Sequence, residues 1–373
     1  MSVDARSRAW ATLALIGVPQ RELVELLRAF ATPDGVLAAT RRQIDTLVPA
    51  ATAERLARGP AAAHLSATLE WLATPGHRLI SWDDPDYPQS LLDVADAPAA
   101  LFYLGRPALL NRTAVAIVGS RQATAQGRDD AHAFAHALSA AGVTIVSGLA
   151  LGIDAAAHQG ALAAVPADAP PDHAAGATIA VVGTGLDRVY PARNRALAHA
   201  IAERGGLLSE FAPGTPPLKG NFPRRNRLIS GLARGVLVVE ATLSSGSLIT
   251  ARLAGEQGRD VFALPGSIHS PLSRGCHKLI RDGAKLTETV NDILSELGGA
   301  FTAAARPAPA AALPPEDPVQ AALWSALSAA PVDLDRLVAR TGLAAQTVAA
   351  TLTVLELEGR AMSQPGGLWQ RRG

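Results

Sequence analysis

One short segment of this chain collects residue types that suit a phosphate-bearing polymer. Between Glu210 and Glu240 no acidic residue occurs, although the net charge of the whole chain is only +1. Within that interval, residues 219–227 include one lysine, three arginines, two asparagines and one aromatic ring, Phe222. Cationic side chains follow the phosphates of a single strand, and a ring offers a face on which a base stacks. The interval favours a local nucleic-acid surface, although Phe222 taken alone is equally typical of a core residue.

Glycine-rich turns follow the apolar runs that we expect to be strands. Five of six such runs are followed by glycine with serine or threonine close by, which lets the backbone approach a ligand and offers free amides to a phosphate. The six turns begin at Gly119, Ser147, Gly183, Ser209, Glu240 and Pro265. Since parallel strands end at one edge of a sheet, we expect the turns to converge there on a phosphate-bearing ligand.

The first of these turns carries an arginine in place of a nucleotide-binding fingerprint. Gly119–Thr124 lacks the G-x-G-x-x-G spacing of dinucleotide-binding turns, and the chain contains no G-x-x-x-x-G-K-[ST] phosphate loop. Arg121 follows the turn directly, where a guanidinium group can fork onto a phosphate. The alternative is an ion pair with an acid on a neighbouring loop; we favour the phosphate contact.

Signals for catalysis are weak. Four carboxylates follow expected strands and could serve acid–base chemistry or hold Mg²⁺: Asp154, Asp187, Glu210 and Glu240. Asp154 and His158 are one helical turn apart, a spacing that is more often a structural hydrogen bond. No G-x-S-x-G elbow occurs, and the adjacent Cys276 and His277 do not orient a nucleophile and a base toward each other. We therefore expect no catalytic residue, no metal and no cofactor.

Hydrophobic periodicity predicts the elements that position these residues. Short apolar runs alternate with helical patterns over residues 113–297, which predicts buried parallel strands in an extended Rossmann-like, doubly wound α/β domain. Helices are expected over Arg128–Ala141 and Arg193–Arg204, and a surface loop over Val165–Gly176. The expected strands are Ala114–Val118, Val143–Val146, Thr178–Val182, Gly206–Leu208, Val236–Val239 and Val261–Leu264.

The N-terminal flank predicts a small all-α module. In residues 1–75, apolar residues such as Leu23, Leu26 and Leu27 recur at helical spacing, and prolines separate short helices. SAM-like and helix-hairpin-helix modules fit this pattern, as do many helical caps, so a DNA contact here is the less favoured interpretation. Residues 76–112 form a connector with one strand candidate, Leu101–Leu104.

The C-terminal flank predicts a linker followed by a winged helix. Residues 298–316 are rich in alanine and proline, which is typical of an extended linker. Residues 317–373 predict three helices and a hairpin, the order of a winged helix: Val319–Leu327, Asp333–Arg340, Gln346–Glu358 and Ala361–Trp369. Residues 344–351, in its recognition helix, include no basic residue. Because reading of the major groove favours arginine, lysine or a placed amide, we expect a protein contact or an accessory role.

Composition limits the partners and the compartment. With 34 basic and 33 acidic residues among 373, a uniformly basic coat and an acidic tail are both excluded. A hydrophobic fraction of 48% with 18% charged residues indicates a globular chain. The single cysteine suits a reducing cytosol. No run approaches about 18 apolar residues, so we expect a cytoplasmic protein that does not contact a membrane.

Six motifs occur in a fixed order along the chain. They are Ile117-Val118-Gly119-Ser120-Arg121, residues 147–158, Gly183-Thr184-Gly185-Leu186-Asp187 with Tyr190-Pro191, Phe222-Pro223-Arg224-Arg225-Asn226-Arg227, residues 245–251, and Leu264-Pro265-Gly266. Over about residues 101–297 the chain resembles the DNA-processing protein A (DprA/Smf) family, and its flanking modules resemble those of longer members. One departure is His277, where the family pattern has asparagine.

The resemblance implies a function as well as a fold. It implies a homodimer that binds and protects incoming single-stranded DNA without catalysis, and that loads the RecA recombinase in natural transformation. It also implies phosphate contacts from Arg121 and Lys219, and a base pocket beside Asn221 and Phe222. The residues expected to contact DNA are Gly119, Ser120, Arg121, Lys219, Asn221, Phe222, Arg224, Arg225, Asn226, Arg227, Ser245 and Gly246.

A nucleotide-binding sensor or nucleotide hydrolase of similar fold is the rival class. Nucleotide phosphoribohydrolases need the acid of a P-G-G-x-G-T-x-x-E motif, which Pro265-Gly266-Ser267 does not supply.

Overall fold

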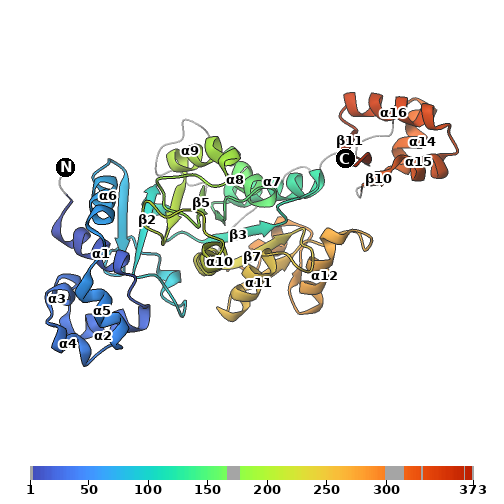
Figure 1. The fold of residues 1–373 in the computed structure, drawn as a ribbon. Coiled ribbons are helices and arrows are strands. Elements are labelled where there is room, and N and C mark those ends of the chain that lie inside the picture. Colours follow the sequence, from blue (N-terminus) through green and yellow to red (C-terminus); the bar gives the residue numbers. More distant parts are fainter. Residues whose placement is uncertain (1–2, 166–176, 299–314, 329–330, 365, 372–373) are drawn as a thin grey trace. The chain divides into compact units, whose positions relative to one another are not determined.

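The computed structural model describes residues 3–165, 177–298, 315–328, 331–364 and 366–371. Most of the predicted surface loop, residues 166–176, and most of the predicted linker, residues 299–314, lie outside this part of the chain. The chain divides into two compact units, whose main parts are Met1–Gly266 and Ala304–Gly373. Figure 1 shows the fold of both units.

A nine-stranded sheet forms the centre of the larger unit, in the order β1-β2-β6-β5-β4-β3-β7-β8-β9. Strands β3 to β9 are parallel, whereas β1 pairs antiparallel with β2, and β2 pairs antiparallel with β6. The strands are β1 (His77–Ser81), β2 (Ala100–Gly105), β3 (Ala114–Gly119), β4 (Thr144–Ser147), β5 (Thr178–Val181), β6 (Gly206–Ser209), β7 (Gly235–Val239), β8 (Asp260–Ala263) and β9 (Lys285–Leu286). The predicted Rossmann-like sheet is confirmed, with two antiparallel strands from the connector added at one edge.

Alternate residues of the central strands face opposite layers of helices. On β3, Ala116 and Val118 belong to one hydrophobic cluster, while Val115 and Ile117 belong to another. Helices α10, α11 and α12 cover the first face, and α7 and α8 cover the second (Figure 1). Helix α13 packs on the second face as well. The helices are α7 (Ala125–Ala140), α8 (Ile153–Ala164), α9 (Arg195–Arg204), α10 (Asn221–Leu232), α11 (Ser247–Glu256), α12 (Arg274–Arg281) and α13 (Val290–Leu294). This burial on both faces explains the continuous apolar runs of the sequence.

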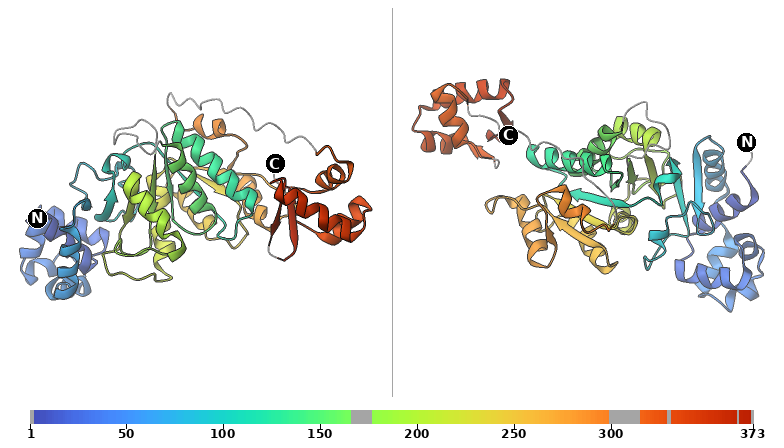
Figure 2. Two further views of the ribbon diagram at one scale, coloured as in Figure 1. Left: turned by 90° about the horizontal axis from the view of Figure 1, so that it is seen from above. Right: turned by 180° about the vertical axis from the view of Figure 1, so that it is seen from behind.

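Six helices precede the sheet and confirm the predicted all-α module. They are α1 (Ala5–Ile16), α2 (Gln20–Phe30), α3 (Pro33–Ala38), α4 (Arg41–Asp45), α5 (Ala50–Arg58) and α6 (Ala62–Leu72). They pack around Trp10, Leu13 and Leu26, and this cluster continues to Ala100 of β2. The module, drawn in blue, therefore lies at the antiparallel edge of the sheet (Figure 2).

The smaller unit is a winged helix, as predicted. Its elements are α14 (Pro318–Ala326), β10 (Val332–Asp333), α15 (Leu334–Thr341), α16 (Ala345–Leu357), β11 (Ala361–Gln364) and β12 (Leu368–Arg371). The strands pair in the order β10-β12-β11. Gly342 ends α15 with a left-handed φ of 68°, which glycine adopts without a steric penalty. Leu337, Val348 and Leu352 form its fully buried centre.

In the part of the chain that the structure describes, no single helix is long and apolar enough to cross a membrane. Helices α15 and α16 would be long and apolar enough only if they were taken together, but the chain bends by 107° between them.

Candidate nucleic-acid interface

The turns after β3 and β4 hold each other in place at the carboxyl edge of the sheet. Gly152 has a φ of 78°, and a Cβ atom there would lie 2.9 Å from the backbone oxygen of Arg121. The amide of Ile153 donates to the backbone oxygen of Ser120 (3.2 Å). A side chain at Gly119 would collide with the carbonyl of Val239. Gly119 and Ser120 are therefore packed against neighbouring backbone, and they position Arg121, whose side chain is exposed.

The first turn of α10 packs onto the turn after β5. Asn221 Nδ2 donates a hydrogen bond to the carbonyl oxygen of Gly183 (3.0 Å). The ring of Phe222 lies against the same glycine, since a Cβ atom at position 183 would be 3.0 Å from Phe222 Cδ1. Gly183 therefore provides the space for this ring. Phe222 itself is half-buried, so it is neither a core residue nor a free surface ring.

Arg121 and Lys219 are exposed cations that form no ion pair with an acidic residue in the described part of the chain. Arg121 still acts on a buried acid, because burial raises the pKa of Asp154 and the charges of Arg225 and Arg121 oppose that rise. The other two lysines of the chain are different, because Lys278 pairs with Asp282, and Lys285 pairs with Glu296. Lys219 lies in the turn into α10, and burial together with the charge of Arg121 lowers the pKa of Arg225 on that helix. Arg121 therefore acts on α10 from the turn after β3, and Lys219 precedes the same helix by two residues.

Arg225 is buried beneath this surface. Only 4% of the residue is exposed, and a Cβ atom at Gly148 would collide with its guanidinium group. Burial lowers the pKa of Arg225 to about 10, although the charge of Asp154 acts in the opposite direction. Asp154 accepts hydrogen bonds from the amides of Gly148 (3.1 Å) and Ala150 (3.3 Å). Arg225 and Asp154 thus organise the turn after β4, and no Arg225 surface is open to a polymer.

Arg224 and Arg227 share one buried acid, Glu210. Its carboxylate lies 2.7 Å from Arg227 and 2.9 Å from Arg224, and Arg227 also reaches Asp96 (3.3 Å). Burial raises the pKa of Glu210, against the opposing charges of the two arginines. Arg227 is buried with its partner, whereas Arg224 remains largely exposed and lies over the ring of Phe211. The acid-free interval begins one residue after this acid, so the sequence pattern overstated its free charge.

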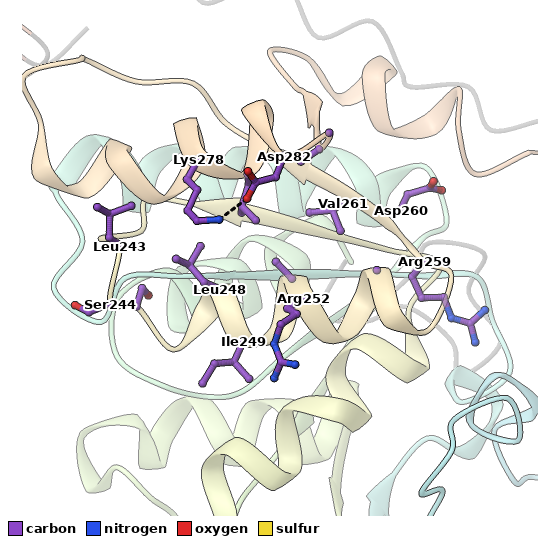
Figure 3. A pocket seen from close by; sticks show the side chains of 16 residues that line it. Leu243, Ser244, Leu248, Ile249, Arg252, Arg259, Asp260, Val261, Lys278 and Asp282 are labelled. Carbon is purple, nitrogen blue, oxygen red and sulfur yellow. Dashed lines mark hydrogen bonds and ion pairs between the residues drawn. The ribbon is translucent and has the colours of Figure 1, made fainter.

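The remaining predicted contacts are Asn226 on α10 and Ser245 and Gly246 in the turn before α11. Asn226 is half-buried on α10. Ser245 Oγ and Ser247 Oγ are 2.7 Å apart, within hydrogen-bond distance, and no atom lies within 4 Å of the place that a Cβ of Gly246 would take. Ser245 lines a groove of about 830 Å³ between α11 and α12. Figure 3 shows Leu248 on α11 and Lys278 on α12 lining this groove, with Lys278 held by Asp282.

The four carboxylates at the strand ends all make structural bonds. Asp187 accepts from the amide of Gly214 (2.8 Å), and Glu240 accepts from the amide (2.8 Å) and hydroxyl (2.5 Å) of Thr124 at the start of α7. Asp154 accepts from the amides of Gly148 and Ala150, and Glu210 pairs with Arg224 and Arg227. Among the described residues no group of three or more histidine, cysteine or acidic side chains is placed to hold a metal ion.

The two histidine and cysteine signals also have structural surroundings. His158 Nδ1 bonds with the hydroxyl of Thr178 (2.6 Å) and not with Asp154, and burial lowers its pKa to about 3. Burial raises the pKa of Cys276 to about 11, and its thiol donates to the carbonyl of Val238 (3.6 Å). His277 Nε2 instead lies 3.0 Å from the oxygen of Gly266.

One residue at this site was missing from the sequence-based set. Tyr190 lies in the turn after β5, and its ring centroid is 5.5 Å from that of Phe222. The motif Tyr190-Pro191 was visible in the sequence, but nothing in its spacing indicated that it meets a ring 32 positions further along the chain. The fold alone brings the two rings together.

Two family models match this chain. The family model described as DNA recombination-mediator protein A matches residues 78–298, and that of the DprA winged helix domain matches residues 307–367. Protein Smf of Escherichia coli is 48% identical over 62% of this chain, a match that spans 60% of that protein, less than two thirds of its length. Protein Smf of Synechocystis is 40% identical over 78% of this chain and 79% of that protein.

Two solved structures are similar as well. DNA processing protein A of Streptococcus pneumoniae matches with a TM-score of 0.66 and 40% identity, over 79% of this chain and 99% of that one. DNA processing protein A of Helicobacter pylori, a structure described for its single-stranded DNA binding mode, matches with a TM-score of 0.52 and 30% identity, over 59% of this chain and 95% of that one. The chain belongs to the DNA recombination-mediator protein A (DprA/Smf) family.

Proposed function

We propose that this chain binds single-stranded DNA at the edge of the sheet where β3, β4 and β5 end. The observation that carries the proposal is the pair of exposed cations, Arg121 in the turn after β3 and Lys219 two residues before α10, which form no ion pair among the described residues. A cation that is already paired gains little from a phosphate, whereas an unpaired one releases condensed counterions when it binds. Both side chains are therefore proposed to contact phosphates.

A base is proposed to lie beside Asn221 and Phe222. Asn221 uses its amide nitrogen to hold the turn after β5, so its carbonyl oxygen is left to accept a hydrogen bond from a base edge. Phe222 is half-buried against Gly183 and offers part of its ring to a stacked base. Arg224, exposed but paired with Glu210, extends the site at its rim.

The remaining predicted residues are assigned different parts in this proposal. Gly119, Ser120, Arg225 and Arg227 position the loops, because each is packed against backbone or held by a buried acid. Asn226 is proposed to lie at the edge of the site. Ser245 and Gly246 are proposed to contact a strand that continues past α10, because the space above Gly246 is open.

The family supplies the wider context of the proposal. The matching model is described as a recombination mediator, and the Helicobacter pylori relative is described as binding single-stranded DNA. We propose that this chain likewise protects incoming DNA in the cytoplasm, acts as a homodimer and loads RecA, without catalysis of its own. The structural bonds of the four carboxylates at the strand ends support a binding role.

A titration with labelled single-stranded and double-stranded oligonucleotides of one sequence tests the central proposal. We expect the single strand to bind more than about tenfold more tightly. Nucleotides incubated with the protein in parallel should be recovered unchanged. Equal affinity for both forms, or release of base or phosphate from a nucleotide, would contradict the proposal in favour of the nucleotide-binding class.

The proposed homodimer and the proposed loading of RecA are each tested by a separate measurement. Light scattering should give a mass twice the 38.4 kDa of one chain. RecA assembly on a single strand should begin sooner when this protein is present at substoichiometric amounts. A mass of one chain would contradict the proposed dimer. An unchanged lag in RecA assembly would contradict the proposed RecA loading. Neither result would contradict DNA binding.

A further inference from the structure

Tyr190 differs from the other tyrosines of this chain. Tyr87 and Tyr103 are fully buried, and their hydroxyls donate to the carbonyl oxygens of Pro98 (2.7 Å) and Arg106 (2.8 Å). Tyr190 is 49% exposed, and no described residue accepts a hydrogen bond from its hydroxyl. Its ring is therefore not explained by core packing.

The exposed ring of Tyr190 lies next to Phe222. The ring centroids are 5.5 Å apart, and the planes are tilted by 40°. Tyr190 belongs to the turn after β5, whereas Phe222 belongs to the first turn of α10, so two elements each bring one ring to the same place. Lone exposed apolar residues are common on proteins, but a pair of rings close in the chain to an exposed cation, here Lys219, is the arrangement that single strands use.

The turn that carries Tyr190 is held in position at several points. Leu186 and Val189 pack into the hydrophobic cluster beneath it. Asn194 Nδ2 donates to the carbonyl oxygen of Leu149 (2.9 Å), and Asp187 accepts from the amide of Gly214 (2.8 Å). A ring on a fixed turn loses little conformational freedom when a ligand binds, which increases the net gain from stacking.

We propose that Tyr190 and Phe222 form a two-ring platform on which neighbouring bases of a single strand stack. The proposal rests on the proposed DNA-binding function and adds a base contact outside α10. Since every base has a face that stacks on a ring, the platform should require bases without strongly preferring one of them. Lys219, which precedes Phe222 by three residues, would neutralise a phosphate of the strand that lies on the platform.

Fluorescence anisotropy of the full chain tests this with two labelled strands of equal length, one of thymidines and one of abasic deoxyribose phosphates. Tyr190→Ala should weaken binding of the thymidine strand about tenfold, because stacking on one ring is worth that much. The same change should alter binding of the abasic strand less than about twofold, since no base is present to stack. Tyr190→Phe keeps the ring and should match the wild type on both strands.

Leu92→Ala is the matched control. Leu92 lies in the connector, and with 50% exposure its loss removes a comparably exposed apolar side chain away from the two rings. This variant should bind both strands like the wild type. Circular dichroism of all variants shows whether the fold is retained, and Tyr190→Trp adds a second measurement, because its emission should be quenched when the thymidine strand saturates the site.

The outcomes separate this proposal from the one on which it rests. If the wild type binds and Lys219→Ala weakens binding, but Tyr190→Ala binds the thymidine strand normally, the platform is wrong and the DNA-binding function stands. Equal losses on the thymidine and abasic strands would also overturn the platform, because they would show a role unrelated to bases. If the wild type binds neither strand, the proposed function fails and the platform fails with it.

Discussion

Helices α10 and α16 each lie where their fold usually binds a ligand or nucleic acid. The two helices differ in charge. Helix α10 begins at the carboxyl edge of the parallel sheet, next to Lys219, and carries three arginines in its first two turns. Helix α16 has the recognition-helix position of the winged helix, yet it carries no basic residue and one acid, Glu356. That acid accepts a hydrogen bond from the amide of Ser363 at the wing (3.0 Å).

The difference teaches that a fold supplies a position, while the residues at that position decide whether a phosphate is bound. The described part of the smaller unit contains six acidic residues and four arginines, so it does not attract a polyanion. Helix α16 instead exposes Leu357 and Val354, which suits contact with a protein. This difference supports the proposal that the larger unit binds single strands, and it favours a protein contact or an accessory role for the smaller one.

The largest expected effect comes from removing both unpaired cations of the larger unit. The double variant Arg121→Ala with Lys219→Ala should lose at least about a hundredfold in affinity for single strands, because two phosphate contacts disappear. Circular dichroism should be unchanged, since both side chains are exposed. The matched control is Arg336→Ala with Arg340→Ala, which removes two cations from the winged helix and should leave affinity nearly unchanged.

Binding measurements on this double variant also distinguish a single-strand-binding protein from a protein that binds free mononucleotides. A pocket built for a free mononucleotide predicts that the double variant loses mononucleotide binding while long single strands are still held by the remaining arginines. Similar losses in the double variant and in its winged-helix control would remove the distinction between the two units.

The next prediction compares the buried cation Arg225 with the exposed cation Lys219. Arg225→Ala should destabilise the fold by about 3 kcal/mol, because Asp154 would keep a buried carboxylate without its nearby positive charge. Lys219→Ala should change the free energy of unfolding by less than about 0.5 kcal/mol, as expected for a surface residue. Denaturant titrations of both variants measure this. Normal stability of Arg225→Ala would show that Arg225 does not organise the turn after β4.

Single removal of each exposed cation gives a smaller, more specific effect. Arg121→Ala and Lys219→Ala should each weaken binding of every base sequence, and each should reduce the slope of log affinity against log salt by about 0.7. Salt titrations of oligonucleotide binding for the wild type and both variants give the slopes. If both variants keep the affinity and slope of the wild type, the assignment of the site is wrong.

The sequence predicted the sheet well because its strands are buried on both faces. Each of the six expected strands lies within one residue of its observed limits, as for β3 and β7, since Val and Ile runs with glycine after them have few alternative structures. Strand β9 was not expected, because two residues are too short to show a period. Strand β1 fell within a connector in which proline and aspartate turns dominate the pattern.

The site was only partly predictable, because a sequence does not show which charges meet. Arg121 is indicated by its position after a strand and Lys219 by the acid-free interval, and both are exposed. Arg225 and Arg227 looked equally available, but the fold buries the first near Asp154 and the second against Glu210. These partners depend on how turns from different strands pack, which local patterns do not encode.

Removal of the winged helix should have a modest effect. A chain ending before Val319 should keep single-strand affinity to within about tenfold of the full chain, since the deleted unit lacks a cationic recognition helix. The same anisotropy titration, with both proteins at equal salt, measures it. A larger loss would show that the smaller unit binds DNA despite its charge. It would contradict the inference that α10, and not α16, lies at the DNA-binding site.

The smallest expected effect concerns intrinsic fluorescence. All five tryptophans lie outside residues 113–297, namely Trp10, Trp71, Trp82, Trp324 and Trp369. Trp10 is buried among the N-terminal helices, and Trp324 lies under the guanidinium group of Arg371 in the smaller unit. Because quenching by stacking requires contact between a base and the indole ring, saturation with a short single strand should change wild-type emission little. Strong quenching would place the strand on the helical module, the connector or the winged helix, and repeating the titration on the chain that ends before Val319 would show whether the winged helix holds it.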